Sequence, residues 1–286
     1  MIQHLVSRIL LRRFAKHKRG PISGLDLHSL EQRTDKVENF GGIQDVDTDA
    51  PDDAEKRWSK EVESRLPHAF ELLDQGKLLS DPIATTTIKK CIALHWARGF
   101  AAREVVDKIL IPGTTQKAIT AILERFTLEQ AAFGLTDGRT SNMSEQALYE
   151  IIHTEFAEKL RRERYLDVAF LELYRKGQSF IESKSLEIWH SPNEEFLLGD
   201  IPVVTYEKDT GKVGILDDVS WSKADAIFMP LGPRHVVALA KEPAYREADA
   251  RTVEILNTCQ VKVALKEVYF RPGSGLGDLI AGALKK

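Results

Sequence analysis

The sequence predicts an α+β fold in which a mainly helical N-terminal two-thirds is followed by an antiparallel β-sheet and a C-terminal helix. Between residues 52 and 174, apolar side chains recur every three or four positions, which is the spacing of one helix face. After Gly177 the chain changes to short β-rich runs separated by Gly, Pro and Asp. Because helices precede strands, we expect a single domain of 286 residues, helical to about 176 and β-rich from about 178 to 270.

The N-terminal part is expected to hold one short strand among helices. A first helix is predicted to end at Gly20-Pro21, before an alternating strand at 22–27 and an acidic, glycine-containing loop at 38–53. The apolar spacing then predicts helices at 52–75, 82–110, 115–126 and 144–174.

The C-terminal part is expected to be an antiparallel meander or curled sheet. The β-rich runs predict strands at 180–189, 196–198, 203–206, 213–216, 226–229 and 236–239. A last helix is predicted at 247–264, and a strand at 268–270. The stretch Gly273-Ser-Gly-Leu-Gly277 has a composition like that of a phosphate loop, but it lacks the strand context, so we interpret it as a flexible tail.

Composition indicates an ordinary soluble protein. The chain is 43% hydrophobic and 29% charged, with a formal net charge of -3. No apolar stretch is long enough for a membrane-spanning helix, so the sequence gives no support to an integral membrane role. Cys91 and Cys259 lie far apart in the sequence, without a spacing typical of a zinc site or a disulfide framework. We therefore expect a reducing, cytoplasmic location.

The first fourteen residues are the most informative segment. If this segment is helical, His4, Arg8 and Arg12 share one face, because they lie four residues apart. An imidazole beside a guanidinium can hold an anion and move a proton. The apolar residues of the same segment favour packing into the core, and we expect the segment to be an integral part of the fold.

Three interpretations of this segment stay open at this point. It can be a core helix whose cationic face is solvated, a functional anion-binding surface, or a targeting presequence or membrane-surface helix. A secretory signal is disfavoured, because Arg8 and the cations from Arg12 to Arg19 leave no uninterrupted apolar region.

The common catalytic signatures are absent from the sequence. It contains no Walker loop, no dinucleotide-binding glycine pattern after a strand, no His-Glu-x-x-His and no Gly-x-Ser-x-Gly. No histidine stands at a convincing metal-ligand spacing from another histidine or a cysteine, and the sequence does not identify a cofactor. His95 and Arg98 share one helix face, but His95 between Leu94 and Trp96 is more typical of a core or boundary residue.

Two turns in the β-rich part carry charged side chains. Asp200 lies where a strand ends before Pro202, and Arg234 follows Pro233 in a rigid turn. Such turns can direct polar groups into a common site. The structural alternative is that Asp200 accepts backbone hydrogen bonds and that the prolines only end strand pairing.

These segments resemble, in order, a bacterial family of unknown function (DUF4238). The family has a Gln-His start, Leu-Arg-x-Phe, a helix with a central Arg, Ser-Asp-x-Pro-Val, Pro-Leu-Ser-Pro-Arg and a closing helix that contains Asn. The corresponding segments here are Gln3-His4, Leu11-Arg12-Arg13-Phe14, Ala93 to Arg98, Gly199-Asp200-Ile201-Pro202, Pro230 to Arg234, and Asn257. Leu5, Gly199, Ile201 and Gly232 depart from the residues common in the family, which are Tyr, Ser, Asn and Ser.

Two classes of function follow from the residues and the resemblance. The first is a hydrolase or nuclease acting on nucleic acid or another phosphorylated substrate. In that class His4 is the general acid or base, and Asp200 orients His4 or a metal-bound water. Arg8 and Arg98 hold the anion, with Gln3 and Arg234 as further substrate-binding residues. The second class is a non-catalytic regulatory or interaction protein of a bacterial defence or toxin-like system, in which these groups form a buried polar network. A protein partner fits that second class. The sequence does not indicate an oligomeric state.

Overall fold

A computed structural model of the chain describes residues 2–4, 6–17, 19–44, 60–98, 165–214, 217 and 219–285, together with 116, 117, 120, 149, 150 and 154. The chain divides into two compact units, one formed by Met1–Ala101 with Leu171–Lys286 and the other by Ala102–Phe170. The helix predicted at 115–126, residues 144–164 of the helix predicted at 144–174, and residues 99–110 of the helix predicted from 82 fall almost entirely outside the described residues. Every strand that the structure describes belongs to the first unit.

The N-terminal segment is a strand followed by a short helix. β1 (Ile2–His4) pairs antiparallel with β4 (Gly42–Gln44), and the Val6 amide donates to the Gly41 carbonyl at 3.0 Å. α1 (Arg8–Leu11) and the 3-10 turn η1 (Arg12–Phe14) follow. The predicted helix through residues 1–14 is therefore wrong in its first half, because pairing with a distant segment extends the chain there. The core interpretation is confirmed for Leu10, Leu11 and Phe14, which are completely buried.

A four-stranded antiparallel sheet joins the two ends of the chain. Its order is β3-β2-β11-β6, formed by β3 (Gln32–Asp35), β2 (Ile22–Asp26), β11 (Glu267–Phe270) and β6 (Leu198–Gly199). α10 (Leu276–Leu284) packs on this sheet, with Ile280 against Leu25 and Phe270. The predicted flexible tail is thus wrong, because its apolar residues form a helix that buries Ile280.

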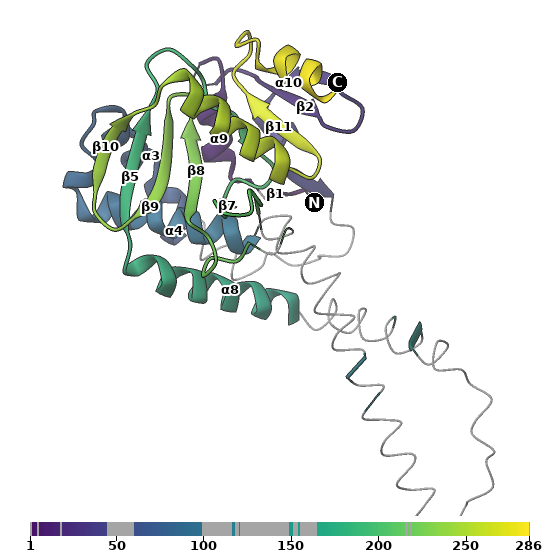
Figure 1. The fold of residues 1–286 in the computed structure, drawn as a ribbon, viewed down its shortest axis with the longest axis vertical. Helices are drawn as coiled ribbons and strands as arrows, with labels where there is room; N and C mark the ends of the chain where they lie inside the picture. The colour runs from purple at the N-terminus through teal and green to yellow at the C-terminus, as the bar shows by residue number, and fades with distance from the viewer. Residues whose placement is uncertain are drawn as a thin grey trace, which may run out of the picture. The chain divides into compact units, whose positions relative to one another are not determined.

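A five-stranded mixed sheet has the order β10-β5-β9-β8-β7 (Figure 1). The strands are β5 (Ser185–His190), β7 (Val204–Tyr206), β8 (Ala226–Gly232), β9 (His235–Ala240) and β10 (Ala244–Glu247). The pairings are antiparallel except that β10 runs parallel to β5. The predicted antiparallel pairing is confirmed for β5, β7, β8 and β9, whereas β10 was missed. The strand predicted from residue 180 starts at 185, because α8 (Tyr165–Glu182) continues to Glu182.

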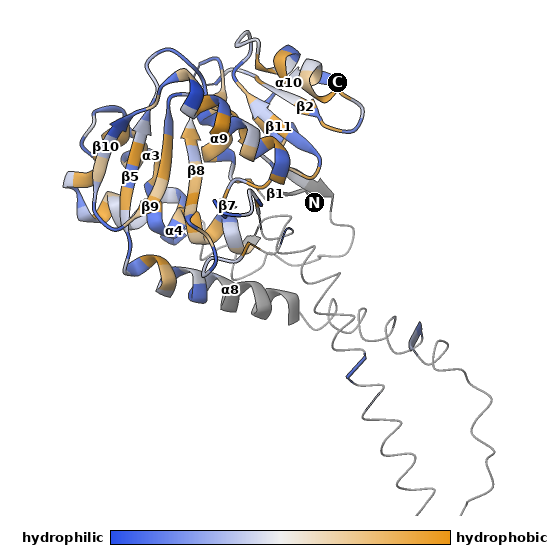
Figure 2. Cartoon of the chain, in the orientation of Figure 1, coloured by the Kyte–Doolittle hydropathy of each residue, from blue (hydrophilic) through white to orange (hydrophobic). Residues whose placement is uncertain are grey.

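Helices cover both faces of the five-stranded sheet (Figure 1). α9 (Ala250–Val263) lies on one face, where Val253 and Val263 join the core of Phe228 and Val236. α3 (Leu66–Asp74) and α4 (Pro82–Arg98) lie on the opposite side, with the 3-10 turns η3 (Glu63–Arg65) and η4 (Leu78–Ser80) before them. Figure 2 shows apolar residues concentrated on the strands between these helices.

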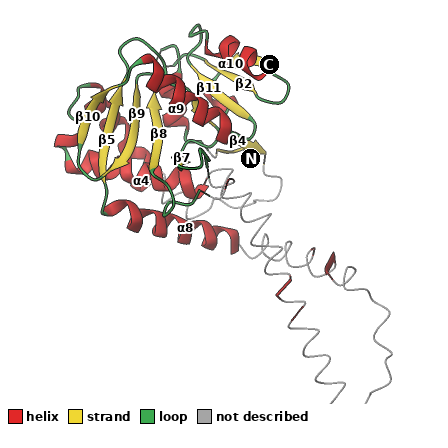
Figure 3. Cartoon of the chain, viewed as in Figure 1, coloured by secondary structure: helices red, strands yellow, loops and turns green. Residues whose placement is uncertain are grey.

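The fold is α+β, but the predicted division into a helical N-terminal two-thirds and a later sheet is wrong. Four strands and the 3-10 turn η2 (Val37–Asn39) lie within the first 44 residues, so strands and helices are interleaved (Figure 3). β3 gave no apolar alternation, because its Gln-Arg-Thr-Asp sequence lies at a sheet edge and three of its four residues are exposed. No helix among the described residues is both long and apolar enough to cross a membrane.

Candidate functional site

Gln3, His4 and Arg8 were predicted to lie on one helix, but the structure divides them between a strand and a helix. Gln3 and His4 belong to β1, whereas Arg8 is the first residue of α1. The prediction that His4 and Arg8 share a helix face is therefore wrong. The side chains of Gln3, His4 and Arg98 lie outside the described residues, so their predicted roles stay predictions. Arg8 is exposed.

Asp200 lies in a closed backbone environment at the end of β6. Its side chain accepts the amides of Leu265 at 2.9 Å, Lys266 at 2.8 Å and Glu267 at 3.2 Å, and the residue is 1% exposed. The first of these bonds ends on Oδ1 and the other two end on Oδ2. Burial raises the pKa of Asp200 to about 6, although the three amide bonds act in the opposite direction. These contacts match the structural alternative considered for Asp200, which is to hold β6 against the turn before β11.

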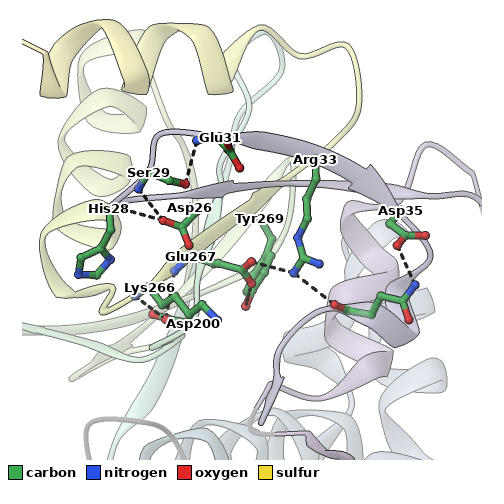
Figure 4. Close-up of polar contacts among 11 residues, drawn as sticks. Asp26, His28, Ser29, Glu31, Arg33, Asp35, Asp200, Lys266, Glu267 and Tyr269 are labelled. Carbon is green, nitrogen blue, oxygen red and sulfur yellow. Dashed lines mark hydrogen bonds and ion pairs between the residues drawn. The ribbon is translucent and has the colours of Figure 1, made fainter. Parts of the chain in front are cut away.

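A polar network extends from Asp200 along β11 (Figure 4). Glu267 accepts a hydrogen bond from Arg33 of β3 at 2.7 Å and another from the Tyr269 hydroxyl at 3.3 Å. The Arg33 guanidinium also lies over the Phe40 ring, 4.2 Å from its centroid. Burial, together with Asp200 and Glu267, raises the pKa of Tyr269 well above 10. Asp200, Glu267 and Tyr269 are buried, whereas the Arg33 side chain is half exposed at the edge strand β3.

Arg234, in the turn between β8 and β9, is paired with residues of the loop that precedes β6. It donates to the Glu194 carbonyl at 2.8 Å and lies 3.6 Å from the Glu195 carboxylate. Arg271 also binds the Glu195 carboxylate: its Nε donates a hydrogen bond at 3.2 Å, and its Nη2 forms an ion pair. The Glu195 carboxylate, which is 10% exposed, thus forms ion pairs with two arginines. Arg234, a predicted substrate-binding residue, therefore has its partners inside the protein.

Helix α9, which contains Asn257, is in direct contact with the segment around Gly199. Asn257 of α9 accepts the Leu197 amide at 3.0 Å and donates to the Glu195 carbonyl at 2.9 Å. Gln260 accepts the Gly199 amide at 2.6 Å. A side chain at residue 199 would meet the Gln260 amide oxygen, because an added Cβ would lie 2.9 Å from it. The absence of a side chain at Gly199 therefore makes room for a structural contact.

His95 is a core residue, as its surroundings in the sequence indicate. It is 1% exposed, its Nε2 accepts the Ser7 amide at 3.2 Å, and its Nδ1 lies 2.9 Å from the Cys91 carbonyl. Because Nε2 accepts, the ring proton belongs on Nδ1, where it is donated to the carbonyl. The imidazole therefore joins α4 to the start of α1.

A second carboxylate, Asp74, stands in a more open position at the end of α3. The Arg13 guanidinium binds both Asp74 oxygens, at 2.6 and 2.5 Å, and its Nε donates to the Leu231 carbonyl of β8 at 3.1 Å. The Asp74 side chain is 48% exposed. An added Cβ at Gly232 would lie 3.2 Å from Arg13 Nε, so the missing side chain there leaves space for the guanidinium. The bidentate pair fixes the position of the carboxylate.

Two histidines lie beside this carboxylate. His235 Nδ1 is 3.8 Å from Asp74 Oδ1, and His235 stands opposite His190 in the pairing of β5 with β9. The two imidazole rings are 5.0 Å apart between centroids. His190 is exposed, whereas the His235 side chain is 13% exposed and its buried Nδ1 has no hydrogen-bond partner among the described residues. We call Arg13, Asp74, His190 and His235 the Asp74 cluster.

Burial is the main reason why His235 stays uncharged. Burial lowers the pKa of His235 to about 4, and the Asp74 carboxylate only partly opposes this. His190 and Arg13 add to the lowering, because like charges disfavour the imidazolium. A neutral imidazole that faces a fixed carboxylate has the residue types of an acid–base pair.

An exposed cationic surface adjoins Arg13 in the sequence. Arg8, Arg12, Lys16 and Arg19 are exposed on α1, η1 and the turn after η1, and we call them the basic strip. Arg12 forms an ion pair with Glu38 at 3.0 Å. The pKa of Glu38 is lowered, first by its own backbone amide and then by Arg12, with a smaller contribution from Arg8.

Sequence reasoning missed most of the Asp74 cluster. Arg13 lies in the Leu11–Phe14 segment and His235 directly follows the Pro230–Arg234 segment, but the predicted substrate-binding residues of these regions were Arg8 and Arg234. No motif or residue spacing in the sequence marks Asp74 or His190 as a functional residue; Asp74 only ends a helix and His190 only ends a strand. Within the described part of the chain, no group of three or more His, Cys, Asp or Glu residues is arranged to hold a metal ion.

The chain belongs to the family described as "Protein of unknown function (DUF4238)", whose model matches residues 2–274. The match covers nearly the whole chain and confirms the resemblance drawn from the ordered motifs. No curated protein and no solved structure matches the chain.

Proposed function

We propose that this protein binds nucleic acid or another phosphorylated polyanion through the basic strip. The observation that carries the proposal is a local charge imbalance: the first 25 residues contain six Arg or Lys and no Asp or Glu. Because Leu10, Leu11 and Phe14 of the same segment fill the core, the cations of the basic strip are left on the solvent side. A net negative chain thereby presents a cationic face.

The chemistry of the strip suits the binding of several phosphate groups. Arginine and lysine neutralise phosphates and release condensed counterions, which supplies most of the affinity of non-specific nucleic-acid binding. One carboxylate, Glu38, offsets part of the charge through Arg12. Arg8, Lys16 and Arg19 extend the strip beyond that ion pair. The predicted hydrolase or nuclease activity rests on this binding and needs a separate reacting centre.

A non-catalytic regulatory or interaction protein, such as a component of a bacterial defence or toxin-like system, is the second candidate function. The Arg13 contacts favour it, because this guanidinium is used to join η1 to α3 and β8. A polar network of this kind can serve only to hold the N-terminal segment on the sheet. The cytoplasmic location also stays a proposal, supported by two buried cysteines that are not joined by a disulfide.

Binding can be measured by fluorescence anisotropy of a labelled single-stranded oligonucleotide across a range of salt concentrations. The test variant combines Arg8→Ala, Lys16→Ala and Arg19→Ala, which leaves the Arg12–Glu38 pair intact. The control combines Lys208→Ala, Lys212→Ala and Lys241→Ala, since these lysines are exposed in other parts of the chain.

We expect the strip variant to bind at least about tenfold more weakly than the wild type. Its slope of log K against log salt should be shallower by about 2, because each single-strand phosphate contact contributes about 0.7 to the slope. The lysine control should keep the wild-type slope. Equal affinities of the strip and control variants, or no binding by the wild type, would show that the basic strip is only a solvated surface.

A further inference from the structure

We infer that the Asp74 cluster is an acid–base centre that cleaves single-stranded RNA. This inference rests on the proposed polyanion binding and adds to it a substrate class and the reacting residues. The cluster and the basic strip are joined through consecutive residues, because Arg12 belongs to the strip and Arg13 holds Asp74. An RNA strand on the strip is therefore bound by the same short segment that anchors the reacting groups.

The first element of the centre is a carboxylate that cannot rotate away. Both Asp74 oxygens are bound by the Arg13 guanidinium, which is itself tied to the Leu231 carbonyl. Arg13 also lies over the Phe70 ring, 5.1 Å from its centroid. These contacts keep Asp74 Oδ1 next to His235 while the side chain stays open to solvent on its other side.

The second element is the His235 imidazole. Nδ1 is the ring nitrogen turned towards Asp74, and it is buried without a hydrogen-bond partner in the described part of the chain. A proton on Nδ1 is attracted by the carboxylate at 3.8 Å, which favours the tautomer with a free lone pair on Nε2. Such an imidazole can accept a proton at Nε2, and the carboxylate stabilises the imidazolium that forms. A buried polar atom without a partner calls for an explanation, and this role supplies one.

The third element is His190, the partner of His235 across the paired strands. Its ring is exposed and lies 5.0 Å from the His235 ring, so a second imidazole can reach the same bound group. Because it is in contact with solvent, His190 can take up a proton from water and deliver it to a leaving group. One buried and one exposed imidazole thus divide the roles of base and acid.

The division of roles suits RNA, because RNA carries its own nucleophile. His235 Nε2 removes the proton of a 2′-hydroxyl, and the 2′-oxygen forms a bond to the adjacent phosphorus. The bond from phosphorus to the 5′-oxygen of the next nucleotide breaks, and protonated His190 gives its proton to that oxygen. The products are a 2′,3′-cyclic phosphate and a 5′-hydroxyl end. Solvent then restores both histidines, so the step needs no oxidant, reductant or other reactant.

The test follows cleavage of a 5′-labelled single-stranded RNA, with the all-deoxy strand of the same sequence alongside. The variants are His190→Ala and His235→Gln, and the matched control is His68→Ala, an exposed histidine on α3. Rates are measured under single-turnover conditions from pH 5 to 8, and product ends are identified by mass. Binding is measured by anisotropy on the same preparations, and folding by circular dichroism.

We expect the wild type and His68→Ala to leave a 2′,3′-cyclic phosphate on RNA and to leave the deoxy strand intact. Each cluster variant should cleave about 10²–10⁴ times more slowly and keep its RNA affinity within about twofold of the wild type. If His235→Gln fails to fold, His190→Ala still decides the outcome, because His190 is exposed.

Three results would overturn the inference. RNA binding without cleavage by the wild type would leave the proposed function standing and remove the acid–base centre. Undiminished cleavage by His190→Ala, or cleavage of the deoxy strand at the same rate, would show that the activity does not come from this chemistry. Absence of both binding and cleavage would overturn the proposed function as well.

Discussion

Two aspartates show how differently the same side chain can be used in this protein. Asp200 is 1% exposed and its oxygens are occupied by three backbone amides. Asp74 is 48% exposed and is held by one guanidinium beside a histidine. The first carboxylate joins strands of the four-stranded sheet, whereas the second lies beside the start of β9, the central strand of the five-stranded sheet, and nearly half of it is open to solvent.

The comparison teaches that a motif does not reveal what its acid does. Asp200 lies in a segment that matches the family pattern, and it was predicted to orient His4 or a metal-bound water, yet its oxygens are used by the fold. Asp74 lies in no motif, and we propose it as part of the reacting centre because its carboxylate is open to solvent beside His235. The deciding quantities are the donors around each carboxylate and its access to solvent, and both are set by residues distant in the sequence.

The largest effect that would test this comparison is expected from Asp200→Asn. An asparagine has one acceptor oxygen, whereas the amides of Leu265, Lys266 and Glu267 are divided between two carboxylate oxygens. At least one buried amide therefore loses its acceptor, and we expect the free energy of unfolding to fall by about 2–4 kcal/mol. Urea denaturation followed by circular dichroism measures this loss.

Asp26→Asn is the matched control for that variant. The amides of His28 and Ser29 both bind a single oxygen, Asp26 Oδ1, at 2.9 and 2.8 Å in an exposed turn. Asparagine can keep both bonds, so the change in unfolding free energy should stay below about 1 kcal/mol. Equal losses in the two variants would contradict the assignment of Asp200 as a buried backbone anchor.

A smaller effect is expected in the pH dependence of stability. The pKa of Asp200 is raised from 3.8 to about 6 on folding, so its proton-linked stability is complete below pH 3.8 and is lost as the pH rises to 6. The pKa of His235 is lowered from 6.5 to about 4, so its contribution is complete above pH 6.5 and is lost as the pH falls to 4. Between about pH 4 and pH 6 the two residues therefore change the free energy of unfolding in opposite directions.

Single variants should separate the contributions of Asp200 and His235 to the pH dependence of stability. As the pH rises from 4 to 6, His235→Gln should lose stability relative to the wild type by an amount on the order of 2 kcal/mol, because the Asp200 slope is no longer opposed. Asp200→Asn should show the reverse tilt, with stability rising more steeply over the same range. Thermal unfolding at half-unit pH steps measures both tilts, and parallel curves for all three proteins would refute this assignment.

The smallest effect on stability is expected from Asp74→Asn. The Arg13–Asp74 ion pair is bidentate, but nearly half of the carboxylate is exposed, so its loss should cost about 0–1 kcal/mol. Denaturation in urea at low and at high salt checks this value, since screening should reduce it further. A loss as large as that of Asp200→Asn would mean that Asp74, too, serves mainly to hold the fold together.

The sequence by itself determined the α+β class, the family, most of the strands after residue 185 and the burial of the N-terminal apolar residues. These features rest on local patterns such as β-rich runs and apolar spacing, which short segments carry without help from distant ones. They also include the cationic character of the first 25 residues, which follows from composition alone.

The tertiary structure decided which segments distant in the sequence come into contact. Ile2–His4 is a strand because Gly42–Gln44 lies beside it, and β3 is a strand because β2 pairs with it, although neither segment shows an alternating pattern. Asp74, His190 and His235 come from one helix and two strands, and only the packing of α3 against the sheet brings them together. Contacts between such distant segments cannot be predicted from periodicity, because the local pattern around each residue is the same whether or not its distant partner is present.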